Sequence, residues 1–223
     1  MKREPTAADR IYEALRQRIL TCEYGEDMAF NEVQLANEFG VSRTPVREAL
    51  HRLEGKNFVS ITKAGAQLLP MDILQLRDCY ECKNVLFIGI AILACDRITD
   101  ARCKQLREMV SVDLNGMDDH TFINWMDKVY RFIYSTTRNS MFEVVMDSSF
   151  DNLFRFISHC IVNDYCDRDK IGTTLISFAE AIIARNRKEA IVRAAKHIDE
   201  SMHITPPSAV LDDGIDDLLS KIY

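Results

Sequence analysis

The stretch that decides the fold is Gly40-Val41-Ser42-Arg43-Thr44-Pro45-Val46-Arg47-Glu48-Ala49-Leu50, which follows Asn31-Glu32-Val33-Gln34-Leu35-Ala36-Asn37-Glu38-Phe39. Apolar residues recur at helical spacing in both segments, so each predicts a short helix with one apolar face. Gly40 stands where the first helix must end in a left-handed residue, and Ser42 is the expected N-cap of the second helix. Pro45 lies in the first turn of that helix, where a missing N–H costs little. This layout predicts a helix-turn-helix.

Two arginines define the exposed face of the second predicted helix. Arg43 and Arg47 are four residues apart, so their side chains lie on the same face. In a helix that lies in the major groove of DNA, such side chains can reach guanine edges or phosphates. The alternative is an ordinary surface helix, which the combination of turn, cap, proline and arginine spacing disfavours. We therefore expect this segment to recognise DNA.

Residues 42–50 resemble the recognition helix of GntR-family bacterial transcription regulators, and residues 11–20 are similar to the first helix of that family. The resemblance implies a winged helix-turn-helix whose DNA contacts are Ser42, Arg43, Thr44, Arg47, Lys63 and Gly65. Two departures stand out. Val33 replaces a frequent phosphate-binding arginine, and the wing at residues 62–66 is less basic than usual. Both departures favour weaker or more selective binding rather than loss of function.

The remaining segments predict a mainly α protein of two domains. A helix over Ala8–Thr21 precedes the helix-turn-helix, and strands Phe58–Thr62 and Gln67–Leu69, turning at Ala64-Gly65, have the size of a wing. Pro70-Met71-Asp72 is the expected linker, with Asp72 capping the next helix. Glycine is scarce and proline absent from there to Pro206, as in a helical bundle. The expected helices are Ile73–Cys95, Asp100–Val112, Asp119–Thr137, Ser140–Val162, Lys170–Arg185 and Arg187–His203. The predicted organisation is a winged helix-turn-helix over 1–70, an all-helical bundle of six to seven helices over 71–205, and an acidic tail over 206–223.

A winged helix followed by such a bundle resembles the FadR subgroup of the GntR family. Residues 129–139, 181–186 and 194–197 match the rhythm of its FCD-type ligand-binding domain. The resemblance implies a small-molecule effector in the bundle and a homodimer formed through it. Because one recognition helix contacts few base pairs, a homodimer would read a palindromic double-stranded operator.

The metal site of many FCD domains is mostly replaced in this sequence. The family's aspartate and three histidines fall at Met126, Tyr130, Leu175 and His197, so one histidine remains. One imidazole cannot make a tight zinc or manganese site, and we expect no metal cofactor. A two-ligand site from Asp127 and His197 is the open alternative, for a register shifted by one residue.

The expected effector contacts are Lys83, Tyr130, Arg138 and His197. Lys83 stands where the family commonly has an arginine, and Phe87 where it has a glutamate. The pocket is therefore expected to be more apolar, and the effector larger or less acidic than a small organic acid. The alternative is that His197 is a hydrogen-bonded core histidine and the pocket is vestigial.

Charge and cysteine usage bound the functional class. The net charge is −6, and residues 1–70 carry ten basic and ten acidic side chains, so the acidic surplus lies outside the predicted DNA-binding part. No apolar run approaches the ~18 residues that span a bilayer, and the start lacks the apolar core of a signal peptide, so we expect a cytoplasmic protein. An odd number of cysteines, seven, argues against a disulfide framework. Small buried hydrophobes are the favoured interpretation, with a thiol redox sensor left open.

The predicted function is a transcription regulator, expected to be a repressor, whose affinity for operator DNA is controlled by an effector. Two other classes remain. A protein-interaction adaptor would keep the fold but not bind DNA, as Val33 and the thin wing would allow. An all-helical enzyme is disfavoured because no nucleophile elbow, paired carboxylates, HExxH motif or glycine-rich phosphate loop is present.

Overall fold

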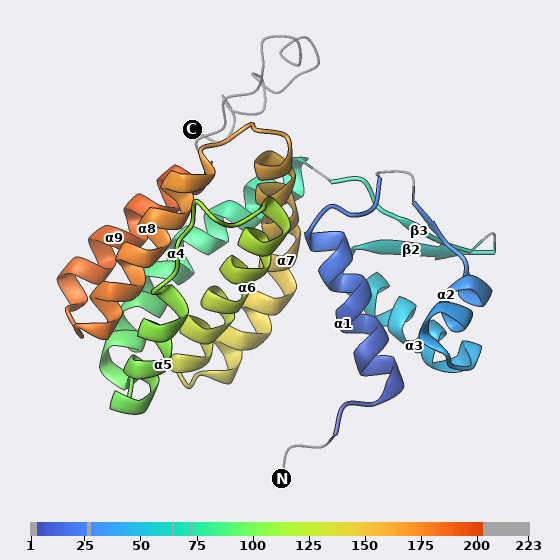
Figure 1. Ribbon diagram of the computed structural model, residues 1–223, viewed down its shortest axis with the longest axis horizontal. Helices are drawn as coiled ribbons and strands as arrows, with labels where there is room; N and C mark the ends of the chain where they lie inside the picture. Colours follow the sequence, from blue (N-terminus) through green and yellow to red (C-terminus); the bar gives the residue numbers. More distant parts are fainter. Residues whose placement is uncertain (1–3, 26–27, 64, 72, 203–223) are drawn as a thin grey trace. The chain divides into compact units, whose positions relative to one another are not determined.

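The computed structural model describes residues 4–25, 28–63, 65–71 and 73–202. The chain divides between Asp72 and Ile73 into two compact units, which can be followed by colour in Figure 1. The architecture is mainly α with one small antiparallel sheet, as predicted. The expected cap at Asp72 and the expected tail over 206–223 lie outside the described residues.

The N-terminal unit packs its helices and sheet around one apolar core. Its elements are α1 (Ala7–Leu20), β1 (Ala29–Phe30), α2 (Glu32–Phe39), α3 (Arg43–Glu54), β2 (Val59–Thr62) and β3 (Gly65–Leu68). Leu15 of α1, Val46 of α3 and Phe58 before β2 are fully buried, because the apolar face of each segment turns toward the others. Thr6 and Asp9 form a capping box at the start of α1.

The turn between α2 and α3 has the predicted glycine geometry. Gly40 adopts φ 65° and ψ 37°, and its N–H donates to the carbonyls of Ala36 and Asn37. The N–H of Val41 donates to the carbonyl of Ala36 at 3.0 Å, so the turn closes the last carbonyls of α2. Ser42 occupies the N-cap position of α3, but its hydroxyl makes no capping hydrogen bond, which corrects the expected cap.

The sheet has the strand order β1-β3-β2 with antiparallel neighbours. Gly65 pairs with Thr62, so β3 begins at Gly65, two residues before the predicted Gln67. The strand β1 was not predicted, because two residues carry no alternation of their own. Ala29 and Phe30 are a strand only through their pairing with Gln67 and Ala66 of β3.

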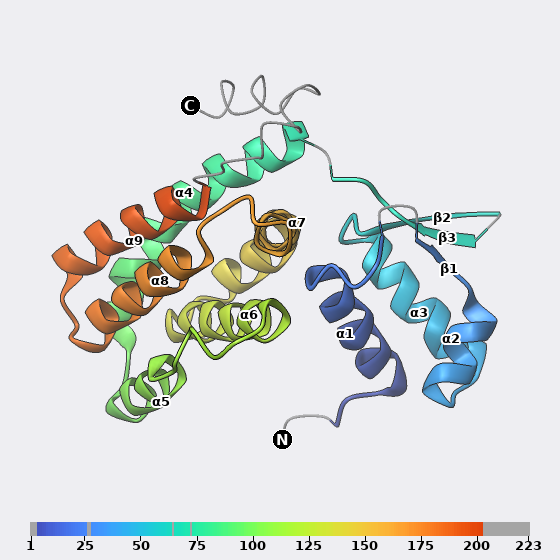
Figure 2. The same ribbon diagram turned by 45° about the horizontal axis from the view of Figure 1, so that its top comes forward.

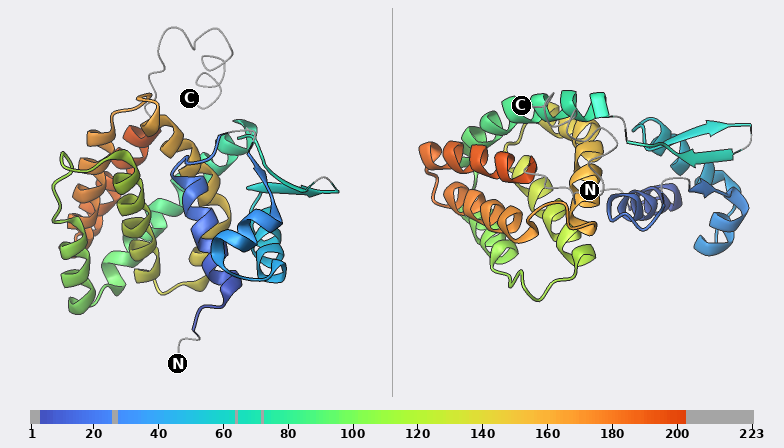
Figure 3. Two further views of the ribbon diagram at one scale, coloured as in Figure 1. Left: turned by 45° about the vertical axis from the view of Figure 1, so that its right-hand side comes forward. Right: turned by 90° about the horizontal axis from the view of Figure 1, so that it is seen from above.

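The C-terminal unit is a helical bundle, also as predicted. Its helices are α4 (Ile73–Arg97), α5 (Asp100–Val110), α6 (Asp119–Thr136), α7 (Ser140–Val162), α8 (Arg168–Ile183) and α9 (Arg187–Met202). Each packs against the next in the order α4, α9, α8, α5, α6, α7 and back to α4. This ring is visible in Figure 2 and, from another side, in Figure 3. Among the described residues, no helix is long and apolar enough to cross a membrane.

Side-chain caps explain where helix ends differ from the prediction. Asp167 accepts a hydrogen bond from the N–H of Lys170 at 3.0 Å, so α8 begins at Arg168 rather than at Lys170. Thr99 caps α5 at the predicted start, and α4 continues to Arg97, two residues beyond the predicted Cys95. The predicted end of the last helix at His203 lies outside the described residues.

Candidate nucleic-acid interface

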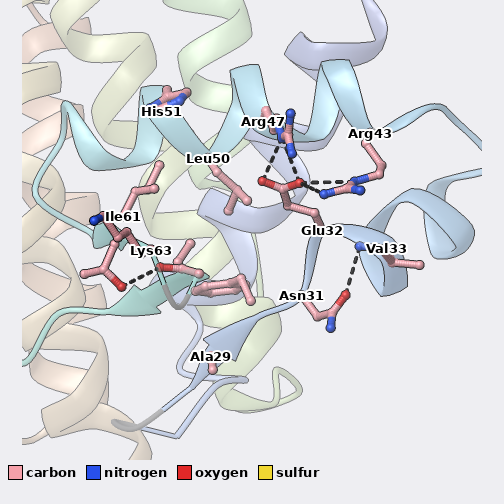
Figure 4. Close-up of a pocket in the computed structure, with 14 residues that line it drawn as sticks. Ala29, Asn31, Glu32, Val33, Arg43, Arg47, Leu50, His51, Ile61 and Lys63 are labelled. Atoms are coloured by element: carbon pink, nitrogen blue, oxygen red, sulfur yellow. Dashed lines mark hydrogen bonds and ion pairs between the residues drawn. The ribbon is translucent and has the colours of Figure 1, made fainter.

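One face of the N-terminal unit carries a groove of about 680 Å³ between α3, the start of α2 and the wing formed by β2 and β3. Figure 4 shows the groove, with α3 on one side and, on the other, β2 and the turn after it that carries Lys63. Its ionisable lining residues are Glu32, Arg43, Arg47, His51 and Lys63. At neutral pH, Arg43, Arg47 and Lys63 supply positive charge to the groove and Glu32 supplies negative charge.

The structure brings four of the six predicted DNA contacts to this groove. Arg43 and Arg47 line it from α3, and Lys63 and Gly65 line it from the wing. The side chains of Arg43 and Arg47 are 55% and 57% exposed, so a ligand in the groove can reach them. Ser42 and Thr44 are exposed at the first turn of α3 but are not lining residues.

The two arginines share one carboxylate. Glu32, the first residue of α2, accepts hydrogen bonds through Oε2 from Nη2 of Arg43 at 2.8 Å and from Nε at 3.2 Å. Nε of Arg47 lies 2.9 Å from Oε1 and 2.8 Å from Oε2. Figure 4 shows Glu32 between the two side chains. These contacts, Arg43 first, lower the pKa of Glu32.

Polar contacts hold α3 against the rest of its unit. Oε1 of Glu54 accepts from the backbone N–H of Ile61 at 2.9 Å, which fastens the end of α3 to β2. Arg52 donates to Asp9 at 2.8 Å and lies 4.1 Å from the ring centroid of Tyr12 on α1. Hydrogen bonds from Thr6 and then from Arg52 lower the pKa of Asp9 to about 2. Helix and wing are therefore fixed relative to each other before any ligand binds.

Val33, which stands where the resembled family often has a phosphate-binding arginine, lies in the first turn of α2. Asn31 caps this helix by accepting from the N–H groups of Val33 at 2.9 Å and Gln34 at 3.2 Å. The side chain of Val33 lines the groove and is 50% exposed. An apolar group therefore occupies a position from which a longer cation could reach a phosphate.

Sequence reasoning missed two ionisable residues of the groove. His51 lies one helical turn after Arg47 on the same face of α3, and this spacing could have identified it. Glu32 is 11 and 15 residues before its two arginine partners, and no local pattern signals that contact.

In the C-terminal unit, the structure brings together three of the four expected effector contacts. Lys83, Tyr130 and His197 are all buried in the bundle. The Tyr130 hydroxyl hydrogen-bonds Nε2 of His197, and Thr174 Oγ1 lies 2.9 Å from Nδ1 of the same ring. Arg138 does not join them: it is exposed, with φ 49°, in the turn after α6.

The residues at the mapped metal positions do not fit a metal. Met126 and Leu175 are buried side chains without a hard ligand atom, and both ring nitrogens of His197 are in hydrogen bonds. Asp127 accepts from Nε of Arg131 at 3.1 Å, so the structure does not bring it to His197 as the two-ligand alternative required. Within the described ranges, no group of three or more histidine, cysteine or acidic side chains could hold a metal ion.

The interior of the bundle is filled by aromatic rings where the resemblance implies a pocket. The ring centroids of Phe87 and Phe178 are 5.3 Å apart, and those of Tyr130 and Phe150 are 5.1 Å apart. Beside Lys83 there is a pocket of about 10 Å³, which is room for about one water molecule. Nζ of Lys83 lies 3.4 Å from Ser201 Oγ, and in the described part of the chain it contacts no carboxylate.

Two of the seven cysteines are buried like small hydrophobes, four are partly exposed and one is exposed. Cys95 and Cys160 are buried, Cys82 is exposed, and no disulfide joins the cysteines of the described ranges. Burial raises the pKa of Cys95 to about 11, which disfavours the reactive thiolate. Burial also raises the pKa of Cys79, so neither thiol has the lowered pKa of a redox sensor.

The fold and the groove together define the N-terminal unit as a winged helix-turn-helix domain. Residues 7–67 match the family model described as "Bacterial regulatory proteins, gntR family". This domain therefore belongs to the gntR family.

The curated relatives are named as regulators of transcription. The chain is 40% identical over 81 residues to the Nta operon transcriptional regulator of Aminobacter aminovorans, covering 36% of this chain and 39% of the relative. It is 26% identical over 116 residues to the transcriptional repressor RspR of Escherichia coli, covering 49% and 51%. The chain thus spans about half or less of the length of these relatives. Their names agree with the expectation that the chain is not an enzyme.

Solved structures extend the likeness of fold to both units. The Escherichia coli protein McbR/YncC matches with a TM-score of 0.73 at 17% identity, covering 98% of this chain and 99% of that chain. A GntR regulator of Rhodococcus sp. RHA1, described as putative, matches with a TM-score of 0.63 at 17% identity, covering 96% and 97%. At this identity the likeness shows the fold alone.

Proposed function

We propose that this chain is a sequence-specific DNA-binding regulator of transcription. The observation that carries the proposal is the groove with exposed Arg43 and Arg47 on one wall and Lys63 and Gly65 on the other. The major groove of B-DNA is wide enough to admit an α-helix, and a narrower minor groove lies next to it. With α3 in the major groove and the wing at the minor groove, the sugar-phosphate strand between them would occupy the hollow.

The charge of the groove supports a nucleic-acid ligand. Arg43, Arg47 and Lys63 outnumber the single carboxylate of Glu32, although the whole chain has a net charge of −6. A local cationic surface on an acidic protein favours a defined phosphate-binding face over general adhesion to nucleic acid. Binding through this face would weaken as salt rises, because phosphate contacts release counterions.

The proposed assembly is a homodimer that reads a palindromic operator. One recognition helix contacts few base pairs, so specificity calls for two helices related by a two-fold axis. An apolar surface suited to the contact lies on α4 and α7, which pack together where Phe142 approaches Gly89. Its exposed members are Val85, Ile88, Met141 and Val144. Exposed apolar patches of this kind mark interaction sites.

The proposed control is a small-molecule effector that acts through the buried Lys83 group in the FCD-like bundle. The Lys83 amine has a hydroxyl but no carboxylate within reach among the described residues, so a molecule that offers an oxygen acceptor would find a partner there. For the effector to enter, the aromatic side chains in the interior of the bundle must move apart. Effector binding would therefore change how the helices pack, which is the requirement for allosteric control. A thermal-shift screen of organic acids, sugar acids, amino acids and acyl compounds tests the proposal, because a ligand of the native state raises the melting temperature.

Repression is the proposed direction of control, in the cytoplasm, where operator DNA lies. It is supported by relatives named as repressors, RspR and the gluconate operon transcriptional repressor of Bacillus licheniformis, the latter 27% identical over 113 residues and covering 48% of this chain and 46% of that relative.

The experiment that tests the DNA-binding proposal is selection from a pool of random duplexes with the full chain. We expect enrichment of an inverted repeat with guanines in each half-site, and loss of enrichment in the Arg43→Ala, Arg47→Ala double variant. A folded wild-type protein that enriches no sequence would contradict the proposal and favour the adaptor.

A further inference from the structure

We propose that Glu32 is a positioning residue that holds Arg43 and Arg47 as one unit and thereby sets the base specificity of α3. The inference rests on the proposed DNA-binding function. Glu32 belongs to α2 and reaches the two arginines of α3 from that other helix (Figure 4).

The hydrogen bonds to Glu32 hold the Nε side of each guanidinium. The other guanidinium nitrogens remain available to a DNA base. Glu32 takes Nε and Nη2 of Arg43 and Nε of Arg47. In the described structure, Nη1 of Arg43 and both terminal nitrogens of Arg47 make no hydrogen bond. A guanidinium has five N–H donors, so each arginine keeps enough of them for a guanine O6 and N7.

The relative exposure of the three side chains fits support rather than obstruction. The Glu32 side chain is 28% exposed, whereas Arg43 and Arg47 are each more than half exposed. DNA that approaches the groove therefore meets the cations before the carboxylate. The net charge of the cluster remains +1, so a phosphate strand is still attracted.

Fixing the arginines in advance makes recognition more selective. A free arginine loses side-chain freedom when it binds, and it can also turn to a nearby phosphate instead of a base. Held through Nε by Glu32, both side chains keep the direction that a bidentate base contact requires. Loss of the carboxylate would release them to phosphates, which raises non-specific binding while specific binding falls.

The fold does not depend on this cluster, so a variant can test it. Glu32 is the first residue of α2, where Asn31 supplies the cap, and its ion pairs are exposed. Exposed ion pairs contribute little to stability. Glu32→Gln removes the charge and keeps the size of the side chain.

The matched control is Glu38→Gln. Glu38 lies on the same helix and pairs with Arg18 at 2.6 Å, so this variant removes the same charge without touching either recognition arginine. Circular dichroism and the melting temperature of both variants should match those of the wild type.

The test compares the sequences that wild type, Glu32→Gln and Glu38→Gln enrich from one random duplex pool, and the affinity of each protein for an unrelated duplex. We expect Glu32→Gln to lose about tenfold in discrimination at the guanine positions and to bind the unrelated duplex at least as tightly as before. Glu38→Gln should keep the base preference of the wild type.

Two outcomes would overturn the inference. In the first, Glu32→Gln keeps the full base preference. In the second, it gains equally on enriched and unrelated duplexes, which would make Glu32 a competitor of DNA. If the wild type itself enriches nothing, the proposed function fails and this inference fails with it.

Discussion

Lys83 is the residue whose surroundings say most about the bundle. Its Nζ lies 5.1 Å from the ring centroid of Phe150 and 5.6 Å from that of Phe87, with only the Ser201 hydroxyl near enough to accept a hydrogen bond among the described groups. Burial lowers the pKa of Lys83 to about 7. Burying the Lys83 amine without a carboxylate partner lowers stability, and such a group is a candidate for ligand binding, as proposed above.

This lowered pKa predicts how stability depends on pH. Between pH 7 and about 10.5 the unfolded chain binds a proton at Lys83 that the folded chain does not, so the free energy of unfolding rises with pH in this window. Lys83→Met removes the effect. We expect the variant to be more stable than wild type by more than ~1 kcal/mol at pH 7, and the difference to shrink toward pH 9.

Urea unfolding of both proteins at pH 7, 8 and 9 measures that difference. Burial raises the pKa of Tyr130 and lowers that of His197, but both residues are present in the two proteins, so the comparison isolates the contribution of Lys83. Cys79 and Cys82 border the same small pocket and are present in both proteins. A difference that is equal at all three pH values would contradict a buried amine that has no carboxylate partner among the described residues.

For single residues, the sequence predicted the position of a side chain when that position depends only on spacing within one helix. The spacing of Arg43 and Arg47 was enough to place both on one face, and the structure places both in the groove. The partnership with Glu32 depends on the angle between two helices, which no local pattern encodes. The same holds for His197, because only the packing of α6 and α8 against α9 shows that both its nitrogens are used.

The turn between α2 and α3 is the element that aims the recognition helix. Gly40 has φ 65°, and an added Cβ would meet no atom within 4 Å, so an alanine there would suffer backbone strain alone. Gly55 after α3 has φ −62°, an ordinary helical value, and an added Cβ would make ordinary contacts at 3.6 Å. The chain thus offers a test and its control at the two ends of the same helix.

We expect Gly40→Ala to lower the free energy of unfolding of the N-terminal unit by about 1–2 kcal/mol, because a left-handed residue with a Cβ is strained. Gly55→Ala should be neutral or stabilising by up to about 1 kcal/mol, because alanine restricts the unfolded chain. Urea unfolding of the full chain, followed by circular dichroism, compares the two. Equal effects at both positions would show that the left-handed turn does not constrain the fold.

Helices with a periodic apolar pattern could be predicted from the sequence. A strand that exists only because it pairs with another strand could not. The ranges predicted for α5, α6 and α7 agree with the structure to within two residues at each end. The strand β1 exists only by pairing with β3, and the early start of β3 follows from the pairing of Gly65 with Thr62. The expected side-chain cap at Ser42 is absent, which leaves its hydroxyl available for a phosphate.

At the scale of the whole molecule, composition predicted the architecture better than the interior. Scarce glycine and the absence of proline between residues 72 and 206 correctly indicated a helical bundle. The resemblance implied a pocket in that bundle, but aromatic rings fill it, and the buried Met126 and Leu175 offer no hard ligand atom at the mapped metal positions. The sequence at the family's metal positions indicated which metal ligands are replaced. It did not indicate which side chains fill the interior of the bundle.

The distribution of charge also acts at this scale. The cationic groove lies within residues 1–70, which have equal numbers of acidic and basic residues, while the rest of the chain carries the acidic surplus. The exposed apolar surface of α4 and α7 lies on the bundle, so the proposed dimer contact and the proposed DNA contact belong to different units. A dimer formed through the bundle would present two groove-bearing units to the DNA, so we expect the binding sequence to be two-fold symmetric.

The most direct test of the central claim is an equilibrium fluorescence-anisotropy titration of the enriched duplex with wild type, Arg47→Ala and Arg10→Ala. Arg10 is exposed on α1 and does not line the groove, so its variant removes the same charge from the same unit. We predict that Arg47→Ala weakens binding to the enriched duplex by about 1–3 kcal/mol and binding to an unrelated duplex much less, whereas Arg10→Ala changes neither. An unchanged affinity of Arg47→Ala for the enriched duplex would contradict recognition of DNA through the groove.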